Sequence, residues 1–515
     1  MLIPRLFGQA FGNLKDIPFA VGYVAGIFMI IQFVKELPKP RWSTTIWLGL
    51  AIAFTCSVRI GGLIIFAYLG LAIIAYIIPK PFLLKHIVST KLCLVRLLGR
   101  ILVIVIIGYF AGLLFWPFAL QDIFKNPLES LSVMEHYSVS IRQVFEGKVM
   151  WSTQLPWYYL LKWLMISIPE FVILGLICFF CFFNLNKIKQ NMEQLILELF
   201  VIFTFLFPIV YVIVIDSNLY SGIRQMLFVL PLIAILSSIG IFKILNTDFR
   251  RVIKIPVIVF FFLLMMLPLK HQAATFPSDY IYFNSISGGN KKAWANYEYD
   301  YYFHGIRKSS EYLINLIGGE NVTVATNCNL SNYFEDIPNI KYNYAHYLER
   351  SSVDWDYGLF GVNYIHPFLL KSGKWQSTDI VKTFYHLGNP LVVLLKRSGK
   401  SDLKGIGEMQ NGEFESAKTS IEQAINADEN NIWLLVQMAK ISLNLKDFES
   451  FNTYLQKGRE LYPTYEPFFL LEAQYLFDNE DYSGSKKVLE RLIEVNPRYN
   501  SAAPLLNAVN NKLKI

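Results

Sequence analysis

The stretch that decides the fold is residues 43–78, STTIWLGLAIAFTCSVRIGGLIIFAYLGLAIIAYII, which is apolar throughout except for one charge, Arg59. As a single helix it would be about 54 Å long at 1.5 Å per residue, whereas the hydrocarbon core of a bilayer is about 30 Å thick. We therefore predict two membrane-spanning helices. The break is expected at 57–62 (SVRIGG), where a charge and two glycines permit a tight reversal.

Other apolar stretches follow the same pattern in the first half of the chain. The composition is 54% hydrophobic, with 41 Phe and 29 Tyr in 515 residues, which is far from that of an ordinary soluble protein. Eight spans are predicted: 17–34, 43–58, 63–78, 101–120, 160–183, 199–215, 226–242 and 255–269. The result is an α-helical polytopic membrane domain over residues 1–270.

Charge in the connecting segments predicts the orientation. The segments 35–42, 79–100, 184–196 and 243–254 hold 14 Lys and Arg, and the alternate segments hold 7. Because cytoplasmic loops carry the excess of Lys and Arg, the first set is expected in the cytoplasm. The N-terminus and everything after residue 270 are then extracytoplasmic. The +8 formal charge is attributed to these loops, so no nucleic-acid partner is expected.

Two water-exposed domains are predicted after the spans. Residues 271–400 combine two short buried strands, 321–325 (NVTVA) and 390–395 (PLVVLL), with a helical pattern over 304–318, which indicates a small α/β domain. The polar stretch 397–402 (RSGKSD) is interpreted as a linker. The five cysteines have no disulfide or metal spacing; a divalent metal stays open as a cofactor, without a visible ligand cluster.

The last part of the chain repeats with a period of 34 residues. Phe414, Phe448 and Tyr482 are spaced at this interval, as are Pro463 and Pro497. A 34-residue period with helix–turn–helix punctuation is typical of tetratricopeptide repeats. An all-α array is therefore predicted over 405–515, with ordinary helical hairpins as the alternative. Such arrays bind proteins, so a protein partner is expected here.

Three charged residues near the outer ends of spans are the candidates for chemistry, because charge within the hydrocarbon region is costly. Asp16 opens the first span, and its plain alternative is a helix N-terminal acid that favours the dipole. Arg59 and Arg224 could each bind a phosphate bidentately. The alternatives are an interfacial anchor for Arg59 and, for Arg224, a pair with Asp216 or snorkelling.

Aromatic side chains accompany these charges on the predicted outer side. Such residues usually form the aromatic belt of a membrane protein, but their apolar faces also stack on sugar rings. We place Lys162 and Glu170 at an interfacial segment 157–168 followed by a crossing helix near Pro169, with a buried Lys–Glu pair as the alternative. The candidate substrate-binding residues are Gln154, Trp157, Tyr158, Tyr159 and Tyr220.

Five segments occur in one order that resembles a known family. They are FGNLKDIPFA (11–20), VRIGGL (58–63), LPWYYL (155–160), IPEF (168–171) and LYSGIRQMLF (219–228). Together they look like bacterial GT-C glycosyltransferases of the family 39 type, a group related to protein O-mannosyltransferases and lipid A aminoarabinose transferases. The resemblance covers about residues 1–400.

The resemblance implies transfer of a sugar from a polyprenyl-phosphate donor on the periplasmic face of the inner membrane. It implies that a carboxylate deprotonates the acceptor while the polyprenyl phosphate departs. By resemblance, Asp16 would match a second acidic position at the outer end of a span, which makes it the catalytic candidate, and Arg59 or Arg224 would face the donor phosphate. The family's principal acidic pair lies in a first outer loop that precedes the region resembled here, so an N-terminally truncated or inactive transferase is expected. A non-catalytic scaffold that recruits envelope partners through its repeats is the alternative.

Overall fold

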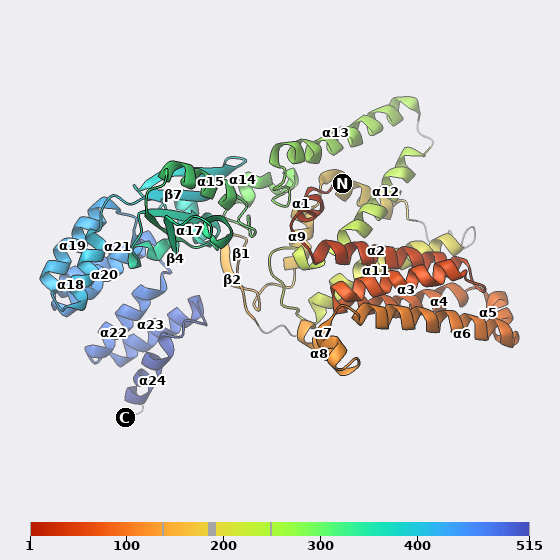
Figure 1. Cartoon of the computed structure of the whole chain (residues 1–515), viewed down its shortest axis with the longest axis horizontal. Coiled ribbons are helices and arrows are strands. Elements are labelled where there is room, and N and C mark those ends of the chain that lie inside the picture. The colour runs from red at the N-terminus through yellow and green to blue at the C-terminus, as the bar shows by residue number, and fades with distance from the viewer. Residues whose placement is uncertain (1, 136–138, 184–191, 248–249, 514–515) are drawn as a thin grey trace. The chain divides into compact units, whose positions relative to one another are not determined.

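A computed structural model describes residues 2–135, 139–183, 192–247 and 250–513 (Figure 1). The chain divides into two compact units. The first contains the chain up to Phe145 together with Met150–Ala293, and the second contains Glu146–Val149 and the chain from Trp294 onward. The predicted boundary after residue 270 differs from this division, which places 271–293 with the membrane unit. Residues outside the described ones fall between the predicted spans 101–120 and 160–183 and within the predicted segments 184–196 and 243–254.

Six helical segments of the first unit are long and apolar enough to cross a membrane: Asp16–Lys35 (α2), Ile60–Ile77 (η1–α4), Lys91–Ala111 (α6–η2), Met192–Val214 (α11), Arg224–Leu245 (η4–α12) and Val252–Thr275 within α13. A seventh is formed if the bent pair α9 (Tyr159–Ser167) and α10 (Glu170–Cys181) counts as one span. The apolar helix α3 (Trp42–Val58) is shorter. These helices indicate a multi-pass membrane protein.

The predicted span 160–183 consists of two helices, α9 and α10, which meet at an angle of 112°. Proline has no backbone N–H and keeps the preceding residue out of the helical region. Ile168 is accordingly extended (φ −95°, ψ 134°), and Pro169 becomes the N-cap of α10. The start of α10 at Glu170 agrees with the prediction of a crossing helix near Pro169.

The reversal between α3 and α4 (Ile64–Ile77) lies where the sequence predicts it. Arg59 is extended and is followed by the short 3-10 helix η1 (Ile60–Leu63). A Cβ on Gly62 would come within 2.8 Å of the backbone nitrogen of Cys56, so the close return of the chain requires glycine here.

The first unit contains several further short elements, and its long helices have separate bounds within the spans named above. They are α1 (Pro4–Gln9), α5 (Pro81–Ser89), α6 (Lys91–Ile106), η2 (Ile107–Ala111), α7 (Pro117–Gln121), α8 (Lys125–Glu135), β1 (Arg142–Phe145), η4 (Arg224–Val229), α12 (Leu230–Leu245), α13 (Arg251–Thr275), η5 (Ser285–Ser287) and α14 (Gly289–Ala293). The strand β2 (Lys148–Trp151) follows β1 in the chain.

The second unit contains a five-stranded sheet of order β4-β3-β5-β7-β6. Strand β3 runs parallel to β4 and β5, whereas β7 runs antiparallel to β5 and β6. The strands are β3 (Val322–Thr326), β4 (Ile340–Tyr344), β5 (Tyr357–Gly361), β6 (Ile380–His386) and β7 (Asn389–Lys396), with helices α15 (Gly305–Ile317), α16 (Ser331–Phe334), η6 (Tyr347–Ser352), η7 (Val362–Tyr364) and α17 (Pro367–Ser372). The two predicted strands and the predicted helix are confirmed as β3, β7 and α15.

Seven helices follow, as three antiparallel pairs and a final single helix (Figure 1). They are α18 (Ser401–Gln410), α19 (Phe414–Ala427), α20 (Ile432–Asn444), α21 (Phe448–Leu461), α22 (Glu466–Asp478), α23 (Tyr482–Val495) and α24 (Ala502–Leu513). Phe414, Phe448 and Tyr482 each begin the second helix of a pair, which explains their 34-residue spacing. A helical repeat array is thus present, up to the last described residue, 513.

The α/β part and the first repeats share one hydrophobic core. Trp355, Phe360 and Val393 from the α/β part belong to the same buried cluster as Leu435 and Phe468 from the repeats. The predicted linker 397–402 is not a loose connection, because the Arg397 guanidinium is buried, pairs with Asp402 and donates to the Val353 carbonyl oxygen (3.0 Å). The polar composition therefore reflects ion pairing at a domain junction.

Gly458 of α21 permits the close packing of α21 against α22. A Cβ at this position would overlap the Phe468 ring, so Gly458→Ala is expected to destabilise the second unit by about 1–3 kcal/mol. Gly407 of α18 has no atom near the position of a Cβ, so Gly407→Ala is expected to stabilise its helix by about 0.5–1 kcal/mol. Thermal unfolding should give a lower melting temperature for Gly458→Ala and a higher one for Gly407→Ala than for the parent. Equal melting temperatures for the two variants would contradict the packing described for Gly458.

Candidate functional site

Three charged residues that are far apart in the sequence meet at one end of the membrane unit. Asp16 is the first residue of α2, Arg59 lies between α3 and η1, and Arg224 begins η4. Arg59 forms an ion pair with Oδ1 of Asp16, and Nε of Arg224 lies 3.6 Å from Oδ2. The Asp16 carboxylate is 4% exposed, whereas the two arginine side chains are 27% and 25% exposed. We call this the Asp16 cluster.

Asn13 holds the buried carboxylate from the other side. Its Nδ2 donates to Oδ2 of Asp16 (2.7 Å) and to Oε1 of Gln9 (2.8 Å), and its Oδ1 accepts from the Asp16 backbone N–H (2.8 Å). Sequence reasoning missed Asn13, whose Oδ1 accepts from the backbone N–H groups of Lys15 and Asp16 in the pattern of an Asx turn. Both oxygens of Asp16 are therefore engaged, so the carboxylate is placed to hold the arginines.

Tyr159 positions the loop that presents Arg224. Its hydroxyl donates to Oε1 of Gln143 (3.0 Å) and accepts from the Gly222 N–H (3.1 Å). Gly222 has a positive φ of 66° and packs against the Trp163 ring, and the Arg224 guanidinium lies 5.3 Å from the Tyr220 ring centroid. By bonding to Gly222, the Tyr159 hydroxyl holds the turn that precedes Arg224.

The predicted substrate-binding residues lie in different environments. Trp157 is 69% exposed and Gln154 and Tyr158 are also exposed, whereas Tyr159 is buried in the network above. Tyr220 is half-buried beside Arg224. Trp157 and Tyr159 line a cavity of about 30 Å³, roughly the volume of one water molecule. The structure thus brings Tyr220 to the Asp16 cluster and leaves Trp157 on the surface.

Glu170, at the start of α10, has partners other than Lys162. Its Oε1 accepts from the Ser285 N–H (2.5 Å) and its Oε2 from the Tyr282 hydroxyl (3.4 Å). Burial, reinforced by the Glu170 charge, raises the pKa of Tyr282. Glu170 therefore ties the segment after α13 to the start of α10.

The cluster has the chemistry of an anion site. One carboxylate between two guanidiniums leaves a net charge of +1, and the exposed parts of the arginines remain available to a ligand. Arginine is suited to phosphate because its planar fork donates two parallel hydrogen bonds. Among the described residues, no three His, Cys, Asp or Glu side chains are grouped so that they could hold a metal ion.

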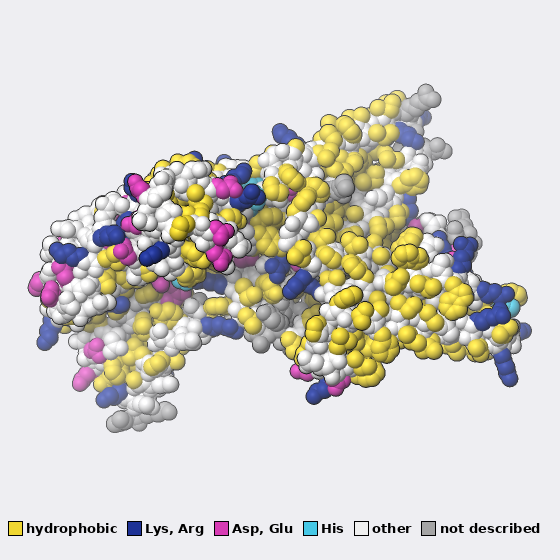
Figure 2. All heavy atoms as spheres, viewed as in Figure 1, with side chains coloured by type: hydrophobic (Ala, Val, Ile, Leu, Met, Phe, Trp, Pro, Cys, Tyr) yellow, Lys and Arg dark blue, Asp and Glu magenta, His cyan; other side chains and the backbone are white. Residues whose placement is uncertain are grey.

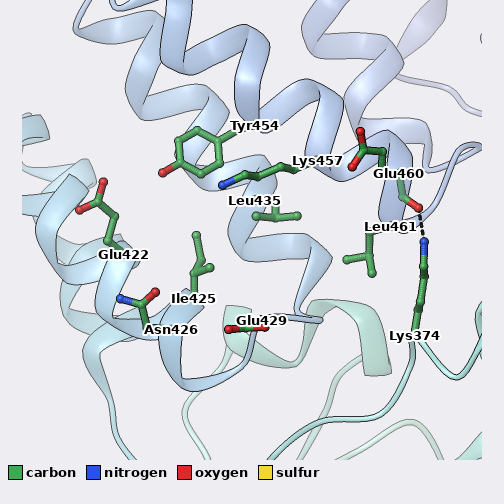
Figure 3. A pocket seen from close by; sticks show the side chains of 10 residues that line it. All are labelled: Lys374, Glu422, Ile425, Asn426, Glu429, Leu435, Tyr454, Lys457, Glu460 and Leu461. Carbon is green, nitrogen blue, oxygen red and sulfur yellow. Dashed lines mark hydrogen bonds between the residues drawn. The ribbon is translucent and has the colours of Figure 1, made fainter.

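A second candidate site is a groove of about 520 Å³ in the second unit (Figure 3). Its floor is apolar, with Ile425, Leu435 and Leu461. Charges of both signs lie around it, and the Lys374 ammonium donates to the Glu460 carbonyl oxygen at one rim. The groove thus combines a small apolar patch with charged side chains of both signs.

Comparisons with known proteins identify no family for the chain. No protein-family model matches, and no curated protein matches. One solved structure that resembles part of it is described as the first TPR of Spaghetti (RPAP3) bound to the HSP90 peptide SRMEEVD, with 21% identity and a TM-score of 0.21. The match covers 22% of this chain and 90% of that chain. The repeat assignment rests on the 34-residue period and the paired helices.

Proposed function

We propose that the chain is a membrane glycosyltransferase that transfers a sugar from a polyprenyl-phosphate donor to an acceptor at the membrane surface. The observation that carries the proposal is the Asp16 cluster, because it holds two partly exposed arginines at the ends of membrane-spanning helices. A lipid-linked phosphate is the anion that reaches such a position from within the bilayer. The family resemblance of the five ordered segments agrees with this ligand.

In the proposed reaction, an acceptor hydroxyl oxygen bonds to the anomeric carbon while the bond from that carbon to the phosphate oxygen breaks. The electron pair leaves with the phosphate, so negative charge develops there. Arg59 and Arg224 are placed to stabilise this charge, since preorganised cations assist a departing anion. The acceptor hydroxyl loses its proton to water at the membrane surface as the new bond forms, because both Asp16 oxygens are engaged.

The proposed localisation is the inner membrane, with the second unit on the extracytoplasmic side. Its support is the charge distribution among the connecting segments. Two ion pairs lie at the helix ends far from the Asp16 cluster, as expected for spans that alternate in direction. Lys80, after α4, pairs with Glu193 of α11 (3.2 Å), and Lys243 of α12 pairs with Glu198 of α11 (3.4 Å). The Asp16 cluster and these pairs then lie at opposite ends of the spans.

Replacing Arg224 by alanine tests the phosphate-binding assignment. Loss of one charged donor is expected to weaken binding of polyprenyl phosphate to the detergent-solubilised full chain by about 10- to 150-fold (about 1.5–3 kcal/mol). The neutral polyprenol of the same length should bind weakly to both proteins. Arg307→Ala is the matched control, because Arg307 is exposed and pairs with Glu311 in the second unit. Equal affinity of Arg224→Ala and the parent for polyprenyl phosphate would refute the assignment.

A non-catalytic scaffold is the second candidate function. It is favoured by the groove of the second unit, which could take a peptide segment of a protein partner of residues 405–515. If the parent chain binds neither polyprenyl phosphate nor its sugar-linked form, the transferase proposal fails and the scaffold remains.

A further inference from the structure

The corner between α5 and the first half of α6 is strongly basic. Residues 79–100 contain no Asp or Glu. Their cationic side chains are Lys80, Lys85, Lys91, Arg96 and Arg100. Figure 2 shows Lys and Arg side chains gathered at the end of the first unit where Figure 1 places α5. We call this region the α5–α6 corner.

Two of these cations are used within the fold. The Lys80 ammonium pairs with Glu193 (3.2 Å) and lies 3.4 Å from the Tyr76 ring centroid. The Arg100 guanidinium lies 3.3 Å from the Trp42 ring centroid. Their roles are therefore explained by helix packing.

The other three cations are exposed and unbalanced. The side chains of Lys85, Lys91 and Arg96 face outward, and no carboxylate of the described residues forms an ion pair with them. Three like charges within twelve residues repel one another unless anions lie nearby. The corner thus presents a cationic surface that the protein itself does not neutralise.

Large apolar side chains are exposed between these cations. Phe82 is 86% exposed and Val95 is 64% exposed, and Val88 and Leu92 are similarly open. Buried Ile87 fixes α5 to the rest of the unit. Cations interleaved with exposed apolar groups are typical of an element that lies in the headgroup region of a bilayer, with its apolar groups among the acyl chains.

We propose that the α5–α6 corner is a binding site for anionic phospholipids, with Lys85, Lys91 and Arg96 on the headgroup phosphates and Phe82 and Val88 against the acyl chains. A zwitterionic headgroup would not balance three cations. A free phosphate would leave the apolar side chains in water. The site lies on segments distinct from the Asp16 cluster, so it stands whether or not the proposed transferase activity is found.

The test is native mass spectrometry of the full chain in detergent, titrated with phosphatidylglycerol, with phosphatidylcholine or with inorganic phosphate. The parent should bind phosphatidylglycerol in preference to phosphatidylcholine. The triple variant Lys85→Gln, Lys91→Gln, Arg96→Gln should lose this preference, with a decrease of about fivefold for each cation removed (~1 kcal/mol each).

Two variants keep the result interpretable. Lys341→Gln, Lys446→Gln, Lys487→Gln removes three exposed charges from the second unit and should bind phosphatidylglycerol like the parent. Lys85→Arg with Lys91→Arg keeps the charge and should also retain the preference. Equal binding of both lipids by the parent would overturn the proposal. Unchanged preference in the triple Gln variant would do the same, as would full competition by inorganic phosphate.

Discussion

Asp16→Ala is expected to destabilise the membrane unit by about 3 kcal/mol, which corresponds to a melting temperature lower by roughly 6–12 °C. The substitution removes the buried carboxylate and leaves Arg59 and Arg224 facing each other without a counter-charge. Removing one partner of a buried pair costs about 3–5 kcal/mol, and the lower end applies because water reaches a quarter of each arginine. Melting of the detergent-solubilised chain measures the effect.

A double variant separates the ion pair from the shape of the site. Asp16→Ala combined with Arg59→Met removes the excess positive charge, so much of the lost stability should return. Binding of polyprenyl phosphate should not return with it. If Asp16→Ala melts like the parent, the Asp16 cluster does not exist as described.

Asp16→Asn distinguishes a positioning role from a role as general base. The change makes the net charge of the cluster more positive, so binding of the donor phosphate should persist. The rate of sugar transfer should fall, because the neutral amide no longer orients the two arginines. A base would contribute the acidic limb of the pH–rate profile, and that limb should vanish in Asp16→Asn. For a positioning carboxylate the acidic limb should remain in the residual activity.

The three charged members of the Asp16 cluster could be selected from the sequence. That they contact one another could not be predicted from it. Charges at the ends of apolar helices are few because burying them in hydrocarbon is costly, which made Asp16, Arg59 and Arg224 conspicuous. The contact among these residues depends on how α2, α3 and α12 pack against one another. The hydrophobic pattern of a sequence does not show which helices are neighbours. Asn13 could have been found, since an Asn commonly forms a turn by bonding to backbone N–H groups two and three residues later.

Other features lay beyond sequence reasoning for specific physical reasons. Trp157, Tyr158 and Tyr159 are consecutive aromatic residues that the sequence does not distinguish, and only Tyr159 is buried, with its hydroxyl bonded to Gln143 and Gly222. The stretch 397–402 has the composition of a linker, but Arg397 and Asp402 form an ion pair with each other, and Lys400 pairs with Asp354 (2.9 Å). By contrast, the repeat helices were predictable because each aromatic at the 34-residue interval begins a helix.

Arg350→Met is expected to destabilise the junction between the α/β part and the repeats by about 3–5 kcal/mol. The Arg350 guanidinium is 2% exposed, pairs with Asp428 and donates to the Tyr347 carbonyl oxygen (2.9 Å). Burial alone would lower the pKa of Arg350, and the Asp428 charge more than offsets this, so its pKa is raised. Without the guanidinium, Asp428 would be left as a buried, uncompensated charge.

Hydrogen exchange over α20 measures this loss, because Asn431 at its N-cap bonds to Ser351 beside Arg350 (2.9 Å). Exchange should accelerate in Arg350→Met and should return toward the parent rate in Arg350→Met combined with Asp428→Leu. Replacing both members of a buried pair by apolar groups is often neutral, whereas removing one is not. Arg307→Ala, at an exposed pair, should leave the exchange of α20 unchanged. If Arg350→Met alone leaves it unchanged as well, then the shared apolar core holds the repeats in place and the ion pair contributes only specificity.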